Sequence, residues 1–190
     1  MILFDPDLDS DPALNSVSAK PAGARAHSLL PSARTLSRFL SRAQVEVRLR
    51  GQVTALLTTD SAIRSLNRRF RGKNKSTDVL SFPAEQFIHS GEKFAGDLAI
   101  SVPTAARQAI AQGHTLSTEI KVLILHGLLH LAGYDHETDK GQMARRESLL
   151  RMRFNLPKGL IERTGQVSQH KDRRTASARP TAGSKREGRP

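Results

Sequence analysis

The sequence predicts an α+β fold in a single domain, with a small β-sheet and helices packed on it. Predicted strands and helices interleave along the chain, but not as regular strand–helix–strand units, which argues against a doubly wound parallel sheet. A length of 190 residues is typical of one domain. No continuous apolar run is longer than four residues, the length of Val122 to Leu125, and this is far shorter than the roughly 20 residues that span a bilayer. We therefore expect no membrane-spanning segment.

The N-terminal part of the chain is predicted to contain one short strand, one long loop and one helix. Ile2 to Phe4 form the strand, and residues 13–31 form the loop because they are small, polar and interrupted by proline. Ser32 is a typical N-cap for a helix that runs to Ala43. Apolar side chains recur at helical spacing between these two residues.

Two strands and a second helix are predicted next. Apolar residues alternate with polar or charged ones at Val45, Val47 and Leu49. This alternation, together with the run VTALLTT after Gly51, predicts a strand or a hairpin pair. Asp60 or Ser61 is then expected to cap a helix that contains Ile63 and Phe70.

The second half of the chain is predicted to be mainly helical and to end in a tail without a core. Its elements are short strands at Val79 to Phe82 and Asp97 to Ile100, and helices from Pro103 to Gln112, from about Ser117 to Ala132 and from about Asp139 to Arg153. Residues 166–190 contain almost no apolar side chain and cannot form a core. We therefore predict a folded domain over residues 1–165 and a disordered basic tail over residues 166–190.

The composition restricts the partners and the chemistry of the protein. Thirty Lys and Arg residues against 18 Asp and Glu give a net charge of +12, which favours polyanions such as RNA. The last 25 residues carry seven basic and two acidic residues, so residues 1–165 keep a charge of +7. Cysteine is absent, which excludes disulfides and thiolate metal ligands and fits a cytoplasmic location.

The segment HGLLHLAGYDH, residues 126–136, contains three of the seven histidines of the chain. His126 and His130 are four residues apart in a predicted helix that is apolar at nine of thirteen positions, so both imidazoles lie on the same side of a buried helix. Burying two imidazoles without partners costs roughly 1 to 3 kcal/mol per unsatisfied nitrogen. A divalent metal ion satisfies both at once, so this zincin-like spacing predicts a metal-binding helix.

A third ligand is predicted just beyond the helix. Gly133 can adopt the left-handed conformation that ends a helix and so returns His136 to the same point. Three protein ligands leave one coordination position open, as in catalytic zinc sites. Metzincin peptidases share this spacing, but they have glutamate as general base directly after the first histidine, where this chain has Gly127. A metallopeptidase-like hydrolase is therefore kept only as a minor alternative.

A second candidate functional segment is strongly basic. Residues 64–75, RSLNRRFRGKNK, contain six basic residues and no acid. Such a run often forms only a solvated helix face. Here Gly72 and a following strand place Arg71, Lys73 and Lys75 on a loop entering the sheet, where a phosphate-binding edge is one interpretation.

The segments FRGKNKSTDVLSFP, AGDLAIS and HGLLHLAGYDH resemble, in order and separation, the signature blocks of the YbeY family of bacterial rRNA maturation factors. The resemblance covers most of residues 34–156. It implies a mixed sheet of about four strands and a metal-dependent, single-strand-selective endoribonuclease in 16S rRNA 3′-end maturation and ribosome quality control. It also implies one Zn²⁺ per chain, and single-stranded rRNA and the small ribosomal subunit as partners. We expect no membrane partner and no DNA partner.

The same resemblance suggests roles for individual residues. His126, His130 and His136 correspond to the zinc ligands, and Arg71 corresponds to a functionally important arginine of the family. Asn74 stands where family members often have aspartate, so no role of a carboxylate is transferred to it.

The mechanism that we predict combines the metal with the basic segment. Arg71 would bind the scissile phosphate bidentately, and Lys73 and Lys75 would contact RNA. Asp97 and Asp135 are candidates for hydrogen bonds that orient a ligand imidazole, although each also has a simpler structural role available. The alternative from a different class is a non-catalytic ribosome assembly factor whose zinc only stabilises the fold.

Overall fold

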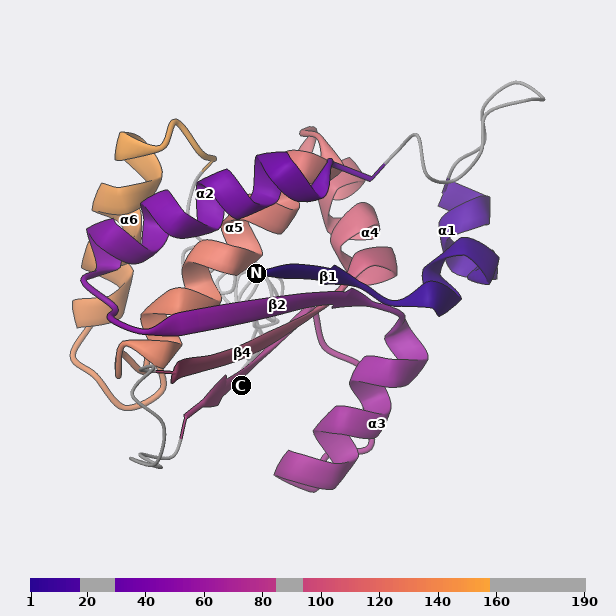
Figure 1. The fold of residues 1–190 in the computed structure, drawn as a ribbon, viewed down its shortest axis with the longest axis horizontal. Coiled ribbons are helices and arrows are strands. Elements are labelled where there is room, and N and C mark those ends of the chain that lie inside the picture. The colour runs from indigo at the N-terminus through magenta and orange to yellow at the C-terminus, as the bar shows by residue number, and fades with distance from the viewer. Residues whose placement is uncertain (18–29, 85–93, 158–190) are drawn as a thin grey trace, which may run out of the picture.

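A computed structural model of the chain describes residues 1–17, 30–84 and 94–157, with side chains for all of these except residues 15–17. Four strands form one mixed sheet in the order β1 (Ile2–Phe4), β2 (Gln52–Thr58), β4 (Phe94–Ser101) and β3 (Val79–Pro83) (Figure 1). β2 pairs parallel with both β1 and β4, whereas β3 pairs antiparallel with β4. The predicted α+β domain with a small mixed sheet is confirmed.

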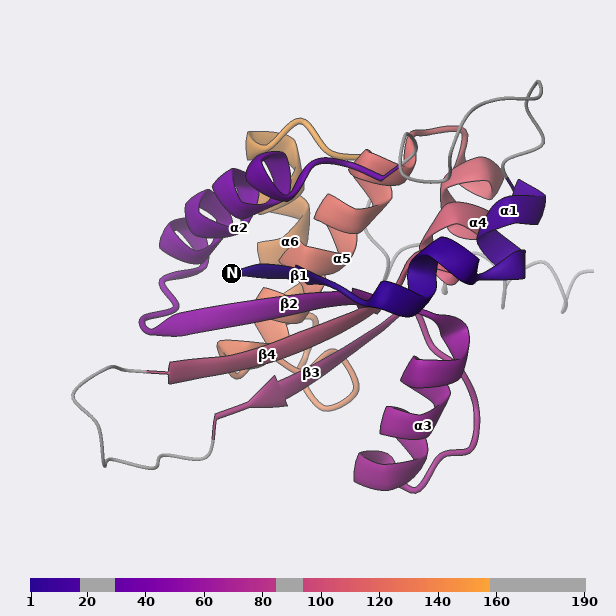
Figure 2. The ribbon, with the colours of Figure 1, turned by 45° about the vertical axis from the view of Figure 1, so that its right-hand side comes forward.

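Helices cover both faces of this sheet unequally. The helices of the described residues are a 3₁₀ helix (Pro6–Ser10), α1 (Pro12–Val17), α2 (Ala33–Val47), α3 (Asp60–Arg71), α4 (Val102–Gln112), α5 (Leu116–Leu131) and α6 (Gln142–Arg153). α2, α4, α5 and α6 lie on one face, and α3 lies on the other (Figures 1 and 2). None of the helices in the described ranges is long and apolar enough to span a membrane.

α5 is the central helix of the thicker layer. Nearly all of its residues from Glu119 to Leu131 are buried, because β3 and β4 lie on one side of it and α2, α4 and α6 contact the others. The backbone at Gly127 lies so close to the sheet that a Cβ atom there would be 2.7 Å from a methyl carbon of Leu98 and 3.2 Å from the hydroxyl of Ser81. The predicted core helix is confirmed, and its packing fixes the position of its two histidines.

The structure corrects one strand prediction. Residues 45 and 47 belong to α2, which continues to Val47 and ends at Arg48 in the left-handed conformation with φ 64°. The alternation was misleading because Val45 is 75% exposed. Val47 instead continues the buried stripe that includes Leu40 and Ala43, which have the spacing of a helix face.

The predicted loop over residues 13–31 is also partly wrong. Residues 13–17 belong to α1, which begins at Pro12, a residue that is favourable in the first turn of a helix. Residues 18–29 lie outside the described residues, as does the predicted disordered tail over residues 166–190. The predicted boundary between domain and tail therefore stays a prediction.

Candidate metal centre and basic segment

The three histidines of the segment 126–136 come together at the end of α5. His126 and His130 are one helical turn apart, and Gly133, with φ 87°, reverses the chain after the helix so that His136 returns to them. The ring centroids are 4.8 Å apart for the pair 126 and 130, 5.5 Å for 126 and 136, and 5.2 Å for 130 and 136. The nitrogens that could bind a metal all lie within 4.8 Å of one another.

The spacing of the imidazole nitrogens fits a divalent metal ion. Nε2 of His126 and Nε2 of His130 are 3.2 Å apart. Two nitrogens that bind one zinc ion tetrahedrally at about 2.0–2.1 Å are separated by roughly 3.3 Å. Burial, followed by the charges of His126 and His136, lowers the pKa of His130 to about 4. His130 is therefore neutral at physiological pH, which is the form of imidazole that binds metals.

The second nitrogen of His126 contacts a buried carboxylate. Nδ1 of His126 lies 3.1 Å from Oε2 of Glu147 on α6, and the side chain of Glu147 is only 1% exposed. With the proton on Nδ1, His126 donates this hydrogen bond and keeps its Nε2 lone pair directed at the other two imidazoles. Carboxylates that orient a ligand imidazole in this way are typical of metal sites.

Arg151 holds Glu147 in place from the same helix. Nε and Nη2 of Arg151 both donate to Oε1 of Glu147, the first at 2.8 Å, and Nη1 donates to the carbonyl of Pro157 at 3.0 Å. Burial alone raises the pKa of Glu147, but the hydrogen bond from His126 and the charge of Arg151 outweigh it and lower this pKa to about 2. Glu147 is thus a carboxylate anion.

Our sequence analysis missed Glu147 and Arg151. A signal was available, because Glu147 lies four residues after Met143 and three before Leu150, on the buried face of α6. A charged residue on the apolar face of an amphipathic helix requires a partner. The sequence does not reveal which histidine that partner is, because α6 reaches α5 only through the tertiary fold.

Carboxylates also shape the loop that carries His136. Asp135 accepts hydrogen bonds from the backbone of Glu137 at 3.0 Å and the hydroxyl of Thr138 at 2.9 Å. These bonds, with that from Glu137 the stronger cause, lower the pKa of Asp135 below its ordinary value. Asp139 accepts from three backbone amides at the start of α6, those of Gly141, Gln142 and Met143. Asp135 therefore stabilises the turn, and its predicted bond to an imidazole stays a prediction.

Asp97 lies on the opposite face of the sheet from α5. Its neighbour Leu98 faces Gly127 of α5, and successive residues of a strand point to opposite faces, so Asp97 points toward the side that carries α3. It is exposed there and pairs in register with Phe82 of β3. A role of Asp97 in orienting a ligand imidazole stays a prediction, while Glu147 is the carboxylate that contacts one.

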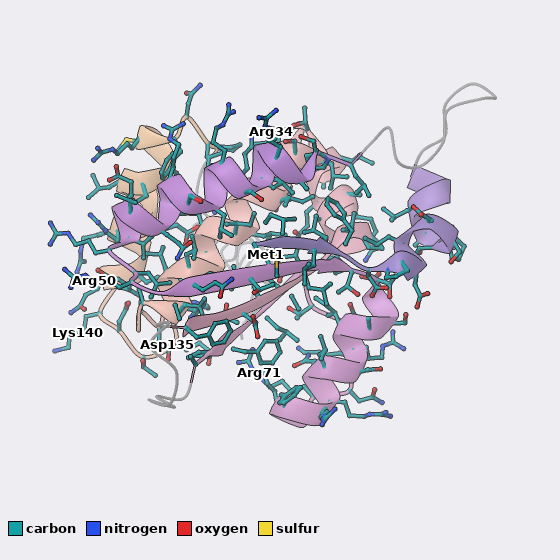
Figure 3. The ribbon with its side chains drawn as sticks, viewed as in Figure 1. Met1, Arg34, Arg50, Arg71, Asp135 and Lys140 are labelled. Atoms are coloured by element: carbon teal, nitrogen blue, oxygen red, sulfur yellow. The ribbon has the colours of Figure 1, made fainter. Side chains whose placement is uncertain are left out.

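The basic residues of the second candidate segment lie at the end of α3. Arg71 is the last residue of this helix, so our placement of Arg71 on a loop is wrong, whereas Lys73 and Lys75 lie on the connection that follows. All three side chains are exposed. Figure 3 labels Arg71 on the face of the sheet that carries α3. The helix continues to this residue because Gly72, with φ 67°, supplies its left-handed C-cap.

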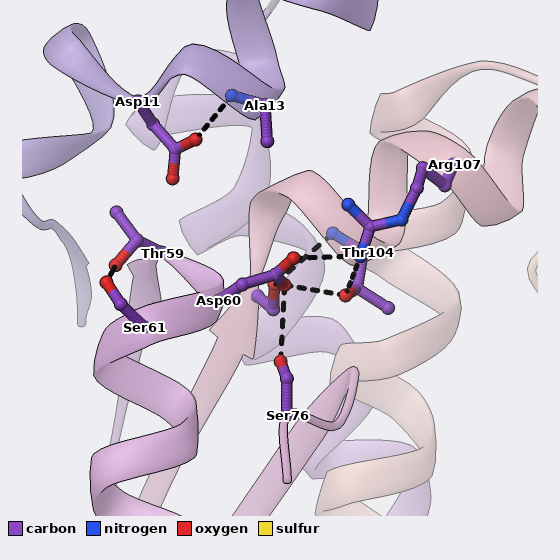
Figure 4. A network of polar contacts seen from close by, with 9 residues as sticks. Asp11, Ala13, Thr59, Asp60, Ser61, Ser76, Thr104 and Arg107 are labelled. Carbon is purple, nitrogen blue, oxygen red and sulfur yellow. Dashed lines mark hydrogen bonds and ion pairs between the residues drawn. The ribbon is translucent and has the colours of Figure 1, made fainter.

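Two polar side chains fix the shape of this connection. The buried amide of Asn67 donates to the carbonyl of Lys75 at 2.8 Å, and the backbone of Lys73 donates to the carbonyl of Asn67 at 3.3 Å. Asp60, at the start of α3, accepts from the hydroxyl of Ser76 at 3.3 Å (Figure 4). The two lysines are therefore presented from a braced connection.

Asp60 also joins α3 to α4 (Figure 4). Its carboxylate accepts hydrogen bonds from the hydroxyls of Ser101 and Thr104, the second at 2.7 Å, and pairs with Arg107 at 2.8 Å. Burial by itself raises the pKa of Asp60, but these three partners outweigh it and lower the pKa below its ordinary value of 3.8. The side chain of Asp60 thus connects α3 with the end of β4, with α4 and with the connection that contains Ser76.

The edge strand β3 lies between the basic segment and the end of α5. The ring of Phe70, next to Arg71, is 57% exposed and lies 5.2 Å from the ring of Phe82 on β3. On the neighbouring strand, a Cβ atom at Gly96 would collide with the carbonyl oxygen of Phe82 and lie 2.9 Å from a methyl carbon of Leu131 in α5. The end of α3 and the end of α5 therefore flank the same part of the sheet, one on each face.

The family model and the curated relatives name the same family. The model of the family described as Endoribonuclease YbeY matches residues 27–155. A protein named Endoribonuclease YbeY from Koribacter versatilis (strain Ellin345) is 55% identical over 133 residues, which are 70% of this chain and 84% of that protein. Its namesake from Solibacter usitatus (strain Ellin6076) is 49% identical over 128 residues, 67% and 83% of the two chains. A solution structure of TM1509 from Thermotoga maritima covers 95% of this chain and all of its own, at 21% identity and a TM-score of 0.45.

Proposed function

The chain belongs to the YbeY family of endoribonucleases, and from this premise we propose that it cleaves single-stranded RNA with a metal ion bound by His126, His130 and His136. The observation that carries the proposal is the convergence of these three imidazoles at the end of a buried helix. The family resemblance further suggests one zinc ion per chain, the 3′ end of 16S rRNA as substrate, the small ribosomal subunit as partner and a cytoplasmic location.

The side chains around the metal centre hold a proton in a defined place. Glu147, anionic and paired with Arg151, keeps the proton of His126 on Nδ1 and so leaves Nε2 free to act as a ligand. His130 is unprotonated at physiological pH because burial lowers its pKa to about 4. A bound zinc ion would supply Lewis acidity toward a phosphate oxygen or a water molecule. Because His136 is exposed, a substrate can approach the centre from the solvent.

The basic segment would bind and orient the RNA. The guanidinium group of Arg71 has the fork geometry that matches a phosphate, and it would stabilise the additional negative charge of the transition state. Lys73 and Lys75 would contact neighbouring phosphates as point charges. The ring of Phe70 is available beside them for stacking on an unpaired base. In this arrangement the RNA strand crosses the β3 edge between α3 and the end of α5.

Two features favour catalysis over the alternative of a zinc-braced assembly factor. Within the described ranges, the group that could hold a metal ion contains three histidines and no fourth ligand, as in sites that keep a coordination position for substrate. The third of these histidines is exposed, whereas structural zinc sites are closed. The metallopeptidase alternative is opposed by Gly127, which stands where metzincins have the glutamate that acts as general base.

The proposed function is tested by cleavage of a labelled single-stranded RNA with the sequence of the 16S rRNA 3′ end. The metal-loaded protein is compared with a His126→Ala/His130→Ala variant that is purified identically, and His170→Ala in the tail serves as the matched control. We expect cleavage by the wild type and the control, and none by the double variant despite an unchanged fold by circular dichroism. Equal cleavage by all three, or by none, would reject the nuclease site and favour the assembly factor.

A further inference from the structure

A second basic surface lies on the side of the molecule away from α3. Residues 33–50 contain five basic residues and residues 142–153 contain four, and all nine are arginine. Each segment has a single acid, Glu46 or Glu147. Lysine, which elsewhere accompanies arginine in this chain, is absent from both segments. This composition favours ligands that are recognised by the planar, bidentate guanidinium group, and phosphates are the main class.

The two segments adjoin where the C-terminal half of α2 meets α6 and the residue that follows it. The ring of Phe39 on α2 lies 5.2 Å from the ring of Phe154 after α6, and the guanidinium of Arg42 lies over the same ring at 5.6 Å. Arg146 on α6 donates to the backbone carbonyl of Glu46 at 2.6 Å. We call the exposed part of this face the arginine surface. It consists of Arg34, Arg38, Arg42, Arg48, Arg50, Arg145 and Arg153.

The acids of the two segments leave most of this charge unneutralised. Glu147 is buried and bound to His126 and Arg151. The carboxylate of Glu46 pairs with Arg153 at 2.9 Å. Among the described residues, Arg34, Arg38 and Arg50 have no ion pair with any carboxylate, and they are therefore available to an external anion.

The geometry of the arginine surface suits a regular row of phosphates. Arg34, Arg38 and Arg42 follow one another at four-residue intervals on one side of α2, which places them about 6 Å apart along the helix axis. Figure 3 labels Arg34 and Arg50 at opposite ends of this helix. Side chains anchored at fixed intervals on a helix match the repeating backbone of a nucleic-acid duplex better than the changing shape of a single strand.

The absence of an exposed ring distinguishes the arginine surface from the basic segment of α3. In residues 33–50 and 142–154, all of which the structure describes, the aromatic residues are Phe39 and Phe154, and neither is exposed. The segment of α3 instead has Phe70 with 57% exposure. Proteins that bind single strands use exposed rings to stack on bases, whereas double-stranded RNA is recognised mainly through its phosphates and ribose hydroxyls.

We propose that the arginine surface of α2 and α6 binds the phosphate backbone of double-stranded RNA. The inference rests on the proposed function, because an RNA substrate is what makes an RNA duplex available to this protein. The surface lies on the outer side of α2 and α6, and α3 lies across the sheet (Figures 1 and 2). The protein would therefore hold a paired region of its substrate RNA with one surface while the other binds the strand that is cut.

The test compares two triple variants of the full-length chain that remove the same charge. Arg34→Gln/Arg38→Gln/Arg50→Gln changes the arginine surface, and Arg64→Gln/Arg68→Gln/Arg69→Gln changes exposed positions on α3. Fluorescence anisotropy measures binding to a blunt RNA duplex at several salt concentrations. We expect the first variant to bind the duplex at least tenfold more weakly, and its log–log salt slope to fall by roughly 0.9 for each phosphate that is no longer neutralised. The second should retain duplex binding within about threefold.

Further measurements separate this proposal from its alternatives and from the proposed function. Cleavage of a short single-stranded RNA should be unchanged in the first variant. Equal losses of duplex binding in the two variants would attribute the effect to net charge and overturn the proposal. Unchanged duplex binding in the first variant would also overturn it.

The exposed apolar residues Val45, Leu149 and Met152 make an anionic membrane the main competing ligand of the arginine surface. The proposal would also be overturned if the wild type bound phosphatidylserine vesicles but not the duplex, and if the first variant no longer bound the vesicles. If no RNA is cleaved but the duplex is bound as expected, only the proposed function fails.

Discussion

The helix with the metal-binding histidines and the helix with the basic residues differ in how much of their surface is buried. α5 is enclosed on almost every side, whereas α3 has only two buried residues, Ile63 and Asn67. Packing fixes the imidazoles of α5 before any ligand binds. The long side chains of Arg71, Lys73 and Lys75 at the end of α3 are exposed instead. Substitutions around the histidines of α5 should therefore alter metal affinity. Substitutions at the end of α3 should lower RNA cleavage and leave metal affinity unchanged.

The largest effect on the α3 side is expected for Arg71→Lys. Lysine keeps the charge but loses the bidentate fork, so the rate of the cleavage step should fall about 100-fold or more. The metal content should remain that of the wild type. Single-turnover cleavage of single-stranded RNA, together with metal analysis of the same sample, measures both quantities.

The matched control for this change is Arg64→Lys, an exposed arginine two turns earlier on the same helix. It should leave the cleavage rate within about twofold of the wild type. Wild-type cleavage by Arg71→Lys would remove Arg71 from the mechanism. Loss of metal in this variant would contradict the expectation that substitutions at the end of α3 leave the metal centre unaffected.

On the α5 side, Glu147→Gln should weaken metal binding. The amide no longer holds the proton of His126 on Nδ1 through a negative charge, and Arg151 loses its anionic partner. We expect the dissociation constant of zinc to rise about 10- to 100-fold, with cleavage restored at saturating metal. A competition titration with a chromophoric chelator measures this constant, and circular dichroism verifies that the variant is folded.

Glu46→Gln is the control for Glu147→Gln. This carboxylate pairs with an arginine of α6 but contacts no histidine, so metal affinity should not change. An unaltered zinc affinity in Glu147→Gln would show that the buried carboxylate does not orient the ligand. Cleavage that stays low at saturating metal would assign Glu147 a second role.

A smaller effect is expected for Phe70→Leu. Leucine fills part of the same space against Phe82 but offers no ring for a base, and one stacking contact contributes roughly 1 to 3 kcal/mol. The KM for single-stranded RNA should rise about tenfold while kcat changes little. Phe4→Leu, an exposed phenylalanine on the opposite edge strand β1, is the matched control. A wild-type KM in Phe70→Leu would exclude stacking at this position.

The same contrast in burial explains what the sequence could reveal. The spacing of His126, His130 and His136, with Gly133 among them, predicted a metal centre because a helix and its C-cap are local structures. The bond between His126 and Glu147 joins residues 21 positions apart on different helices, and no local pattern contains it. The four-stranded mixed sheet was expected only through the family resemblance, because the pairing of β2 with both β1 and β4 is a long-range property.

The incorrect strand prediction at residues 45 and 47 also arose because long-range contacts, rather than the local pattern, decide the structure there. A helix that is buried on one face and a strand can both show an apolar residue at every second position over a short stretch. The choice between them depends on contacts with α5 that the sequence does not display. Arg71 was misplaced because Gly72 ends α3 one residue after it. Boundaries that depend on a single cap are the least predictable part of an element.

The smallest effect is expected at Asp60, which braces the basic segment without contacting RNA in the proposed arrangement. Asp60→Asn keeps the shape but removes the charge that accepts from Ser101 and Thr104 and pairs with Arg107. We expect the free energy of unfolding near pH 7 to fall by about 1 to 2 kcal/mol. The exposed control Asp7→Asn should change it by less than about 0.5 kcal/mol.

The pH dependence of this loss tests its electrostatic origin. The pKa of Asp60 is lowered in the folded protein, so the unfolded chain takes up a proton at higher pH than the folded one does. The stabilisation from Asp60 is therefore fully present above its ordinary pKa of 3.8 and is lost as the pH falls through the lowered value. Urea unfolding should show the difference between Asp60→Asn and the wild type shrinking below about pH 3.8. A difference that stays constant with pH would assign the effect to packing. The connection with Lys73 and Lys75 would then depend on the shape of residue 60 rather than on its charge.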